Sequence, residues 1–221
     1  MDFIQILGIA AAAIAVIMLL LWGISALYRK QRERAVSEES ISSKKVLEKC
    51  LEDITYKRNV ISNLYFPVKA ESSLTSVRYR RVDQIVVGAG GVLLLAVCKE
   101  SGKIDNRDPE IWISIKDDER FEFQSPLVSL HAASGAISGI LRKNGFKEPC
   151  VYEAVVFTDT QSDPVDYTDG VVFMSELERL IKDLNDTKKY DPLDQFFMIR
   201  ALRGAGYTKK QLDKKKAENE K

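Results

Sequence analysis

The sequence predicts an α/β domain behind an N-terminal transmembrane helix. An uncharged apolar run over residues 3–28 predicts the transmembrane helix, and alternating strand-like and helix-like segments over residues 44–185 predict the α/β domain. Of the 221 residues, about 190 follow the apolar run, which is enough for one domain with its own core. We therefore expect four regions: an anchor at 1–28, a juxtamembrane linker at 29–43, the α/β domain at 44–185, and a C-terminal helical hairpin with a basic tail at 186–221.

The apolar run is long enough to cross a bilayer. At about 1.5 Å per residue, a helix over residues 3–28 covers about 39 Å, against a hydrocarbon core of about 30 Å. Trp22 and Tyr28 stand near its C-terminal end, where aromatic side chains suit the membrane interface. Only Asp2 precedes the run, whereas a basic cluster follows it, and the positive-inside rule places that cluster in the cytoplasm. We expect a single-pass protein of the plasma (inner) membrane, with its N-terminus outside and its domain cytoplasmic.

A cleaved signal peptide and a buried globular helix are the two rival interpretations of this run, and a globular helix of this length would be expected to show a polar face. A signal peptide has a basic start, a shorter apolar core and a small-residue cleavage site. The run here begins Met-Asp and ends Tyr-Arg-Lys, which favours a retained anchor.

Composition excludes some classes of protein and says little about partners. The formal net charge is +1, so the overall field favours no particular ligand. The three cysteines are widely scattered and form no CxxC pair, and His131 is the single histidine. A zinc site or a disulfide framework is therefore not expected, and reduced cysteines fit a cytosolic compartment.

The predicted domain begins with a helix and a β-hairpin. Apolar residues from Val46 to Ile54 recur at helical spacing. A strand-like run over 59–66 then ends at Pro67. Residues 78–87 and 92–98 flank a glycine cluster that predicts a tight turn, so these two runs should pair at the centre of a mixed sheet.

The rest of the domain alternates between strands and helices. Pro126 suits the first turn of a helix that stops at Asn144-Gly145. Ser175 is the expected N-cap of a helix over 176–184, because Glu178 follows three residues later. The further strands that we expect are 111–115 and 121–123 around a charged turn, 151–157, and a short edge strand at 171–173.

The C-terminal segment is basic. Residues 192–202 predict a helix, and Thr208 caps a second one. Such an end can bind anionic lipid or nucleic acid, at about 1 kcal/mol per basic residue near a charged membrane. A solvated terminus without function is the other interpretation. The second helix is dominated by Lys209, Lys210, Lys214, Lys215 and Lys216.

Short motifs follow one another in a definite order between Asn59 and Phe173. They are Val82-Asp83-Gln84-Ile85-Val86-Val87, Gly91-Val92-Leu93-Leu94-Leu95 and Gly102-x-Ile104, followed by Trp112, Phe123 and Pro126. In these motifs the segment resembles the nuclease-related domain (NERD) of the PD-(D/E)xK nuclease superfamily. The corresponding motifs of that family are Ile-Asp-His-Val-Val-Val, Gly-Ile-Phe-Val-Ile, Gly-x-Ile, a Trp strand and Phe-x-Asn-Pro. The resemblance implies a restriction-endonuclease-like mixed sheet flanked by helices.

The resemblance also implies a chemistry that this sequence only partly carries. Family nucleases hold a divalent metal between an Asp and a Glu on neighbouring strands, with a Lys two residues after the Glu. The Asp is present as Asp83, but the Glu and Lys positions fall at Ala96 and Cys98. A shift by one residue restores the lysine as Lys99 and puts Val97 at the Glu position, so either register loses a metal ligand.

Other polar positions depart from the family as well. Gln84 replaces the His after the motif Asp, and Ser125 replaces the Asn before Pro126. A replacement carboxylate would have to come from Glu48, Glu52, Glu71 or Glu100. In a purely structural interpretation, Asp83 pairs with Arg80 or Arg81 on a solvated face.

The leading expectation is a membrane-anchored, catalytically degenerate NERD-like domain that binds or scaffolds at the cytoplasmic face. It needs no cofactor, and its partners would be the membrane, a cytoplasmic protein, and anionic lipid or nucleic acid at the lysine-rich tail. The alternative is an active DNA nuclease that uses Mg²⁺ or Mn²⁺ at Asp83 with a relocated carboxylate and Lys99. A third interpretation is an adaptor of another small α/β fold.

Overall fold

The structure, a computed structural model, describes residues 43–70, 73–159, 162–164 and 170–219. The predicted anchor at 3–28 and most of the linker lie outside these residues. Within the described part of the chain, no helix is both long enough and apolar enough to cross a membrane.

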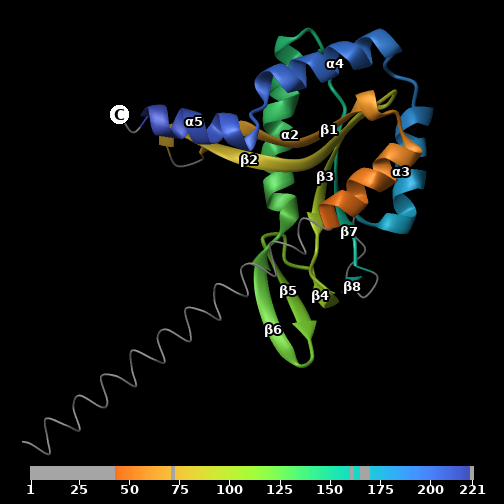
Figure 1. Ribbon diagram of the computed structural model, residues 1–221, viewed down its shortest axis with the longest axis vertical. Helices are drawn as coiled ribbons and strands as arrows, with labels where there is room; N and C mark the ends of the chain where they lie inside the picture. The colour runs from red at the N-terminus through yellow and green to blue at the C-terminus, as the bar shows by residue number, and fades with distance from the viewer. Residues whose placement is uncertain (1–42, 71–72, 160–161, 165–169, 220–221) are drawn as a thin grey trace, which may run out of the picture. The chain divides into compact units, whose positions relative to one another are not determined.

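The larger of two sheets is mixed and has five strands, in the order β1-β2-β3-β7-β9 (Figure 1). The first three strands pair antiparallel, whereas β7 and β9 run parallel to β3. This arrangement confirms the predicted central hairpin, its tight turn at Gly88–Gly91 and the short edge strand β9. The strands are β1 (Val60–Ala70), β2 (Ser73–Gly88), β3 (Gly91–Cys98), β7 (Val151–Phe157) and β9 (Val171–Phe173).

The hairpin turn needs glycine because other backbone segments crowd it. Gly91 has φ +142°, and a Cβ there would lie 2.4 Å from the Cys150 carbonyl oxygen. A Cβ on Gly90 would lie 2.3 Å from the Leu184 carbonyl oxygen. The glycine cluster thus allows the hairpin turn to pack closely against Cys150, just before β7, and against the last turns of the helix that contains Leu184.

A second sheet of four strands, in the order β6-β5-β4-β8, was not expected as a separate sheet. The β5–β6 hairpin was predicted, and Asp117 and Asp118 form its turn with φ of 51° and 62°. The strands β4 and β8, which pair in parallel, were missed. The four strands are β4 (Gly102–Asp105), β5 (Ile111–Lys116), β6 (Glu119–Gln124) and β8 (Ser162–Pro164).

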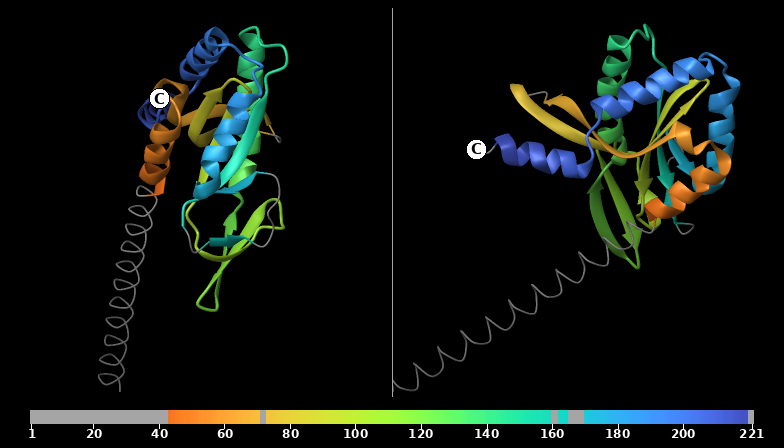
Figure 2. Two further views of the ribbon diagram at one scale, coloured as in Figure 1. Left: turned by 90° about the vertical axis from the view of Figure 1, so that its right-hand side faces the viewer. Right: turned by 45° about the horizontal axis from the view of Figure 1, so that its top comes forward.

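Helices cover both faces of the larger sheet, which gives an α/β sandwich with two hydrophobic cores (Figures 1 and 2). The helices α2 and α4 pack on one face, where Leu94 and Ile137 are fully buried. The helix of residues 43–54 and α3 pack on the other face, around Leu47 and Leu95. The labelled helices are α2 (Pro126–Lys143), α3 (Leu177–Asp186), α4 (Pro192–Ala205) and α5 (Lys209–Asn219), with 3₁₀ turns η1 (Lys57–Asn59) and η2 (Met174–Glu176).

Two predicted boundaries were wrong. The strand expected to end at Pro67 continues to Ala70, because β1 is an edge strand and proline is tolerated there. Ser175 is not an N-cap but lies inside η2, and the Glu176 carboxylate instead accepts a hydrogen bond from the Phe173 backbone N–H at 2.9 Å.

The C-terminal helix packs against the open edge of β1. The backbone N–H groups of Tyr65 and Tyr207 each donate to the carbonyl of the other residue at 2.9 Å. The Lys215 ammonium donates to the Tyr207 hydroxyl at 3.1 Å, and Leu212 is buried. The Thr208 cap of α5 is confirmed, since Thr208 and Gln211 exchange capping hydrogen bonds.

Candidate functional site

Asp83 lies where β2 and β3 separate. Their pairing extends from the turn to Gln84 and Leu95, and Asp83 is the next residue of β2. Its Oδ2 accepts a hydrogen bond from the Val97 backbone N–H at 3.0 Å. The Asp83 carboxylate therefore accepts a hydrogen bond from a backbone N–H that lies beyond the last residue pair of β2 and β3.

A local irregularity in the pleat accompanies this position. Asn63, which is level with Asp83 on β1, has a left-handed φ of 57°. Asparagine tolerates this region better than most residues. Leu64 then faces the same core as Ile61, although residues three apart in a regular strand face opposite sides.

Two cations contact the other oxygen of Asp83. Oδ1 lies 3.1 Å from the Lys44 ammonium and 3.1 Å from Nε of Arg81. The Asp83 side chain is 12% exposed, and those of Lys44 and Arg81 are 22% and 36% exposed. Arg81 also donates from Nη2 to the Asn63 side-chain oxygen at 2.5 Å. The carboxylate is thus largely removed from water and is engaged through both oxygens.

The prediction that Asp83 pairs with Arg81 is confirmed. The prediction that this pair lies on a solvated face was wrong, because the whole Asp83 residue is only 9% exposed. Lys44 was missed. The sequence could have indicated it, because Leu47 and Leu51 follow Lys44 by three and seven positions. This spacing places Lys44 on the same side of its helix as these two buried leucines.

A second polar group lies beside the carboxylate. Gln84, at the family's His position, is 1% exposed. The Ser62 hydroxyl donates to Gln84 Oε1 at 2.7 Å. That contact uses the single hydroxyl proton, so Glu48, whose Oε1 lies 3.3 Å from the Ser62 oxygen, has the weaker contact.

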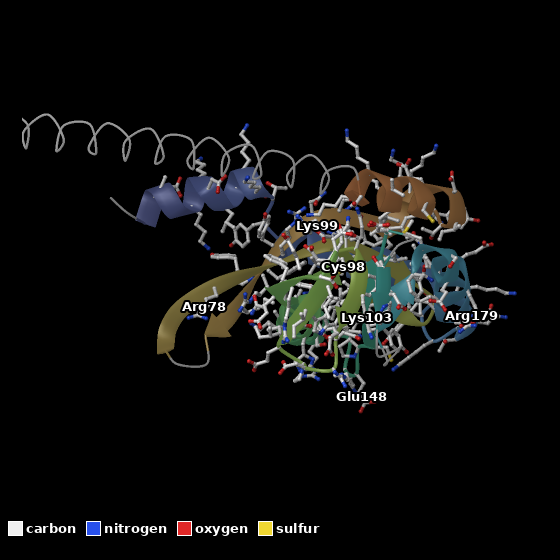
Figure 3. The ribbon with its side chains drawn as sticks, turned by 90° about the horizontal axis from the view of Figure 1, so that it is seen from below. Arg78, Cys98, Lys99, Lys103, Glu148 and Arg179 are labelled. Atoms are coloured by element: carbon white, nitrogen blue, oxygen red, sulfur yellow. The ribbon has the colours of Figure 1, made fainter. Side chains whose placement is uncertain are left out.

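The positions that should supply Glu and Lys present neither group. Ala96 is half-buried against the α2-side core, and Cys98 is 2% exposed within it. Burial raises the pKa of the Cys98 thiol to about 12, so this side chain stays neutral at physiological pH. Figure 3 shows Cys98 between Lys99 and Lys103 in the view from below. Lys99 and Glu100 follow the end of β3 and are half-buried.

The divalent metal that the resemblance implies does not fit this set of side chains. Two cations lie against Asp83, and Ala96 and Cys98 offer no oxygen ligand. Among the described residues, no three His, Cys, Asp or Glu side chains are grouped so that they could hold a metal ion. Of the candidate carboxylates, Glu71 lies outside the described residues. Glu48 and Glu52 line a cleft of about 460 Å³ between the first helix, β1 and the junction of α4 with α5.

Comparison with known proteins identifies the family of the chain. No curated protein and no solved structure matches the chain significantly. Residues 35–158, just over half of the chain, match the nuclease-related domain, NERD. The chain therefore belongs to the nuclease-related domain family.

Proposed function

We propose that this chain is a membrane-anchored NERD protein whose domain binds or scaffolds a partner and no longer cuts nucleic acid. The observation that carries the proposal is the engagement of Asp83 by Lys44, Arg81 and the Val97 N–H. A metal ion binding to this carboxylate would have to displace both cations from Oδ1.

The two cations supply the charge that a metal would supply. Together the Lys44 ammonium and the Arg81 guanidinium carry the same formal charge as one Mg²⁺ ion. A metal would also face an incomplete ligand set, since Ala96 cannot contribute the second carboxylate. Because Mg²⁺ gives up its water reluctantly, one shared carboxylate is a poor site for it.

The anchor, orientation and partners belong to the same proposal and rest on the sequence. Residues 3–28 would hold the chain in the plasma (inner) membrane, with residues 29–221 in the cytoplasm. The partner would be a cytoplasmic protein, and the lysine-rich tail would add contacts to anionic lipid or nucleic acid. Extraction of the full chain from membranes at alkaline pH tests the anchor, because release into the supernatant would contradict it.

A cleavage assay tests the loss of catalysis. Single- and double-stranded DNA would be incubated with residues 43–221 and Mg²⁺ or Mn²⁺, for the wild type, Asp83→Asn, and Ala96→Glu/Cys98→Lys. We expect no cleavage by the folded wild type. Asp105→Asn is the matched control, because this half-buried carboxylate pairs with Arg107 on β4, in the other sheet from Asp83.

Cleavage by the wild type that disappears in Asp83→Asn and persists in Asp105→Asn would overturn the proposal. It would establish the alternative, a divalent-metal nuclease that uses Asp83 with a relocated carboxylate and Lys99.

A further inference from the structure

The outer face of α4 exposes large apolar side chains. Leu193, Phe196 and Phe197 are 61%, 56% and 46% exposed. They lie at positions i, i+3 and i+4, so they share one side of the helix. The two phenylalanine rings contact each other edge-to-face, with centroids 5.7 Å apart. Figures 1 and 2 show α4 along the outside of the domain.

The inner face of the same helix is already used by the core. Met198 and Leu202 are fully buried and Ile199 is 9% exposed. A surface helix is normally apolar on one side only, and a helix that is apolar all round is normally covered on both sides. The exposed apolar side chains on the outer face of α4 are therefore a candidate contact surface.

Basic side chains lie near the Phe197 end of this outer face, whereas Asp191 and Asp194 lie at the start of the helix. Arg200 and Phe197 line one groove with Asn144, which follows directly after the end of α2. The last turn of α2 contributes exposed Arg142 and Lys143 to this end of the domain. Apolar and aromatic side chains flanked by arginine and lysine are typical of surfaces that insert into an anionic membrane interface.

We propose that the outer face of α4 inserts into the interface of an anionic bilayer, with Leu193, Phe196 and Phe197 in the acyl boundary and Arg200 at the headgroups. This inference rests on the proposed anchor at residues 3–28. Residues 29–42 then link the span to the domain, and fully extended they reach about 48 Å, at roughly 3.4 Å per residue. The domain has an expected radius of gyration of about 16 Å, so this tether can bring any of its faces to the bilayer.

A second copy of the chain is a less suitable occupant. The exposed parts of the three side chains sum to an area on the order of 300 Å², since a whole aromatic side chain buries about 150–250 Å². A stable protein interface needs about 800 Å² from each partner. Membrane insertion needs no complementary protein surface, since its strength scales with the buried apolar area and with the attraction of basic side chains to anionic lipid.

Vesicle co-sedimentation tests the inference with a fragment that lacks the anchor. Residues 43–221 form one compact unit that contains both hydrophobic cores, so they are suitable as a soluble fragment. We expect binding to vesicles of phosphatidylcholine with 30% phosphatidylglycerol, and at least tenfold weaker binding in Phe196→Ser/Phe197→Ser. Phe121→Ser is the matched control, because Phe121 is 51% exposed on β6 and should leave binding unchanged.

A spectroscopic readout shows whether α4 itself enters the bilayer. In Phe197→Trp, we expect a blue shift of the tryptophan emission on adding vesicles, and quenching by brominated acyl chains. Trp112 is 1% exposed and gives a constant background. Since the fragment has no anchor, failure here is distinct from failure of the proposed anchor or of the proposed loss of catalysis.

Three outcomes would overturn the inference. One is equal vesicle binding by the wild type and by the folded double variant. Another is no binding and no blue shift. The third is a dimer of the fragment, measured by light scattering, that the double variant abolishes, which would assign the face to a second copy.

Discussion

Asp83→Asn should destabilise the domain, because the cations around Asp83 depend on its charge. Asparagine has the same shape and can still accept the Val97 N–H, so the change removes little except the negative charge. Removing one partner of a fully buried ion pair costs about 3–5 kcal/mol. Lys44 and Arg81 retain 22% and 36% exposure, and this solvent screening reduces the expected loss to about 2 kcal/mol.

The assay is denaturation of residues 43–221, with and without 10 mM MgCl₂. For a domain of this size, about 2 kcal/mol corresponds to a Tm lower by about 6 °C. Lys44→Met should cost about 1 kcal/mol, since Arg81 still pairs with the carboxylate. Asp83→Asn/Lys44→Met should lose less stability than the sum of the two single variants, because it leaves no Lys44 ammonium without its counter-ion.

The opposite sign would refute this reasoning. A carboxylate kept for metal binding is often a liability in the metal-free protein, so its removal leaves stability unchanged or raises it. If Asp83→Asn were as stable as the wild type, and if Mg²⁺ raised the Tm of the wild type alone, the ion-pair interpretation would be wrong.

Three further predictions concern stability. Burial raises the pKa of Cys98 from 9.0 to about 12, so the thiol of the unfolded chain ionises at a lower pH than that of the folded domain. The free energy of unfolding should therefore fall as the pH rises from 9 toward 12. Urea unfolding should give about 1 kcal/mol less stability at pH 10 than at pH 8, and Cys98→Ala should reduce this difference. Asp191→Ala should cost about 1 kcal/mol in the same assay, because Asp191 Oδ1 accepts from Leu193 N and Asp194 N at 2.8 Å at the start of α4. Gly91→Ala should cost at least about 2 kcal/mol, visible as a lower urea midpoint, because its Cβ would meet the Cys150 carbonyl; a stable variant would contradict the turn geometry.

The fold was predictable where local pattern and tertiary packing agree. The apolar run over 92–98 is central in the sheet because Leu94 fills one core and Leu93 and Leu95 fill the other. The strands β4 and β8 were missed because they are only four and three residues long, and because their paired residues lie sixty positions apart in the sequence. Local periodicity carries no information on such a pairing.

The site was predictable only in part. Asp83 and Arg81 are two apart on one strand, so their pairing follows from the period of a strand. Lys44 lies 39 positions earlier, and only packing of its helix through Leu47 and Leu51 brings it to Asp83. The buried state of Asp83 was missed for the same reason, since the helix that covers it lies far away in sequence.

The contact between Tyr207 and Tyr65 occupies part of the β1 edge of the larger sheet. An edge strand with free backbone groups is a template onto which another molecule can add a strand. The turn at Tyr207 occupies part of that template on β1, and α5 covers it further. A chain truncated after Ala205 would keep both cores and would leave the edge of β1 open to pairing with another chain. The lysine-rich C-terminal helix would then limit aggregation through this edge, in addition to carrying positive charge.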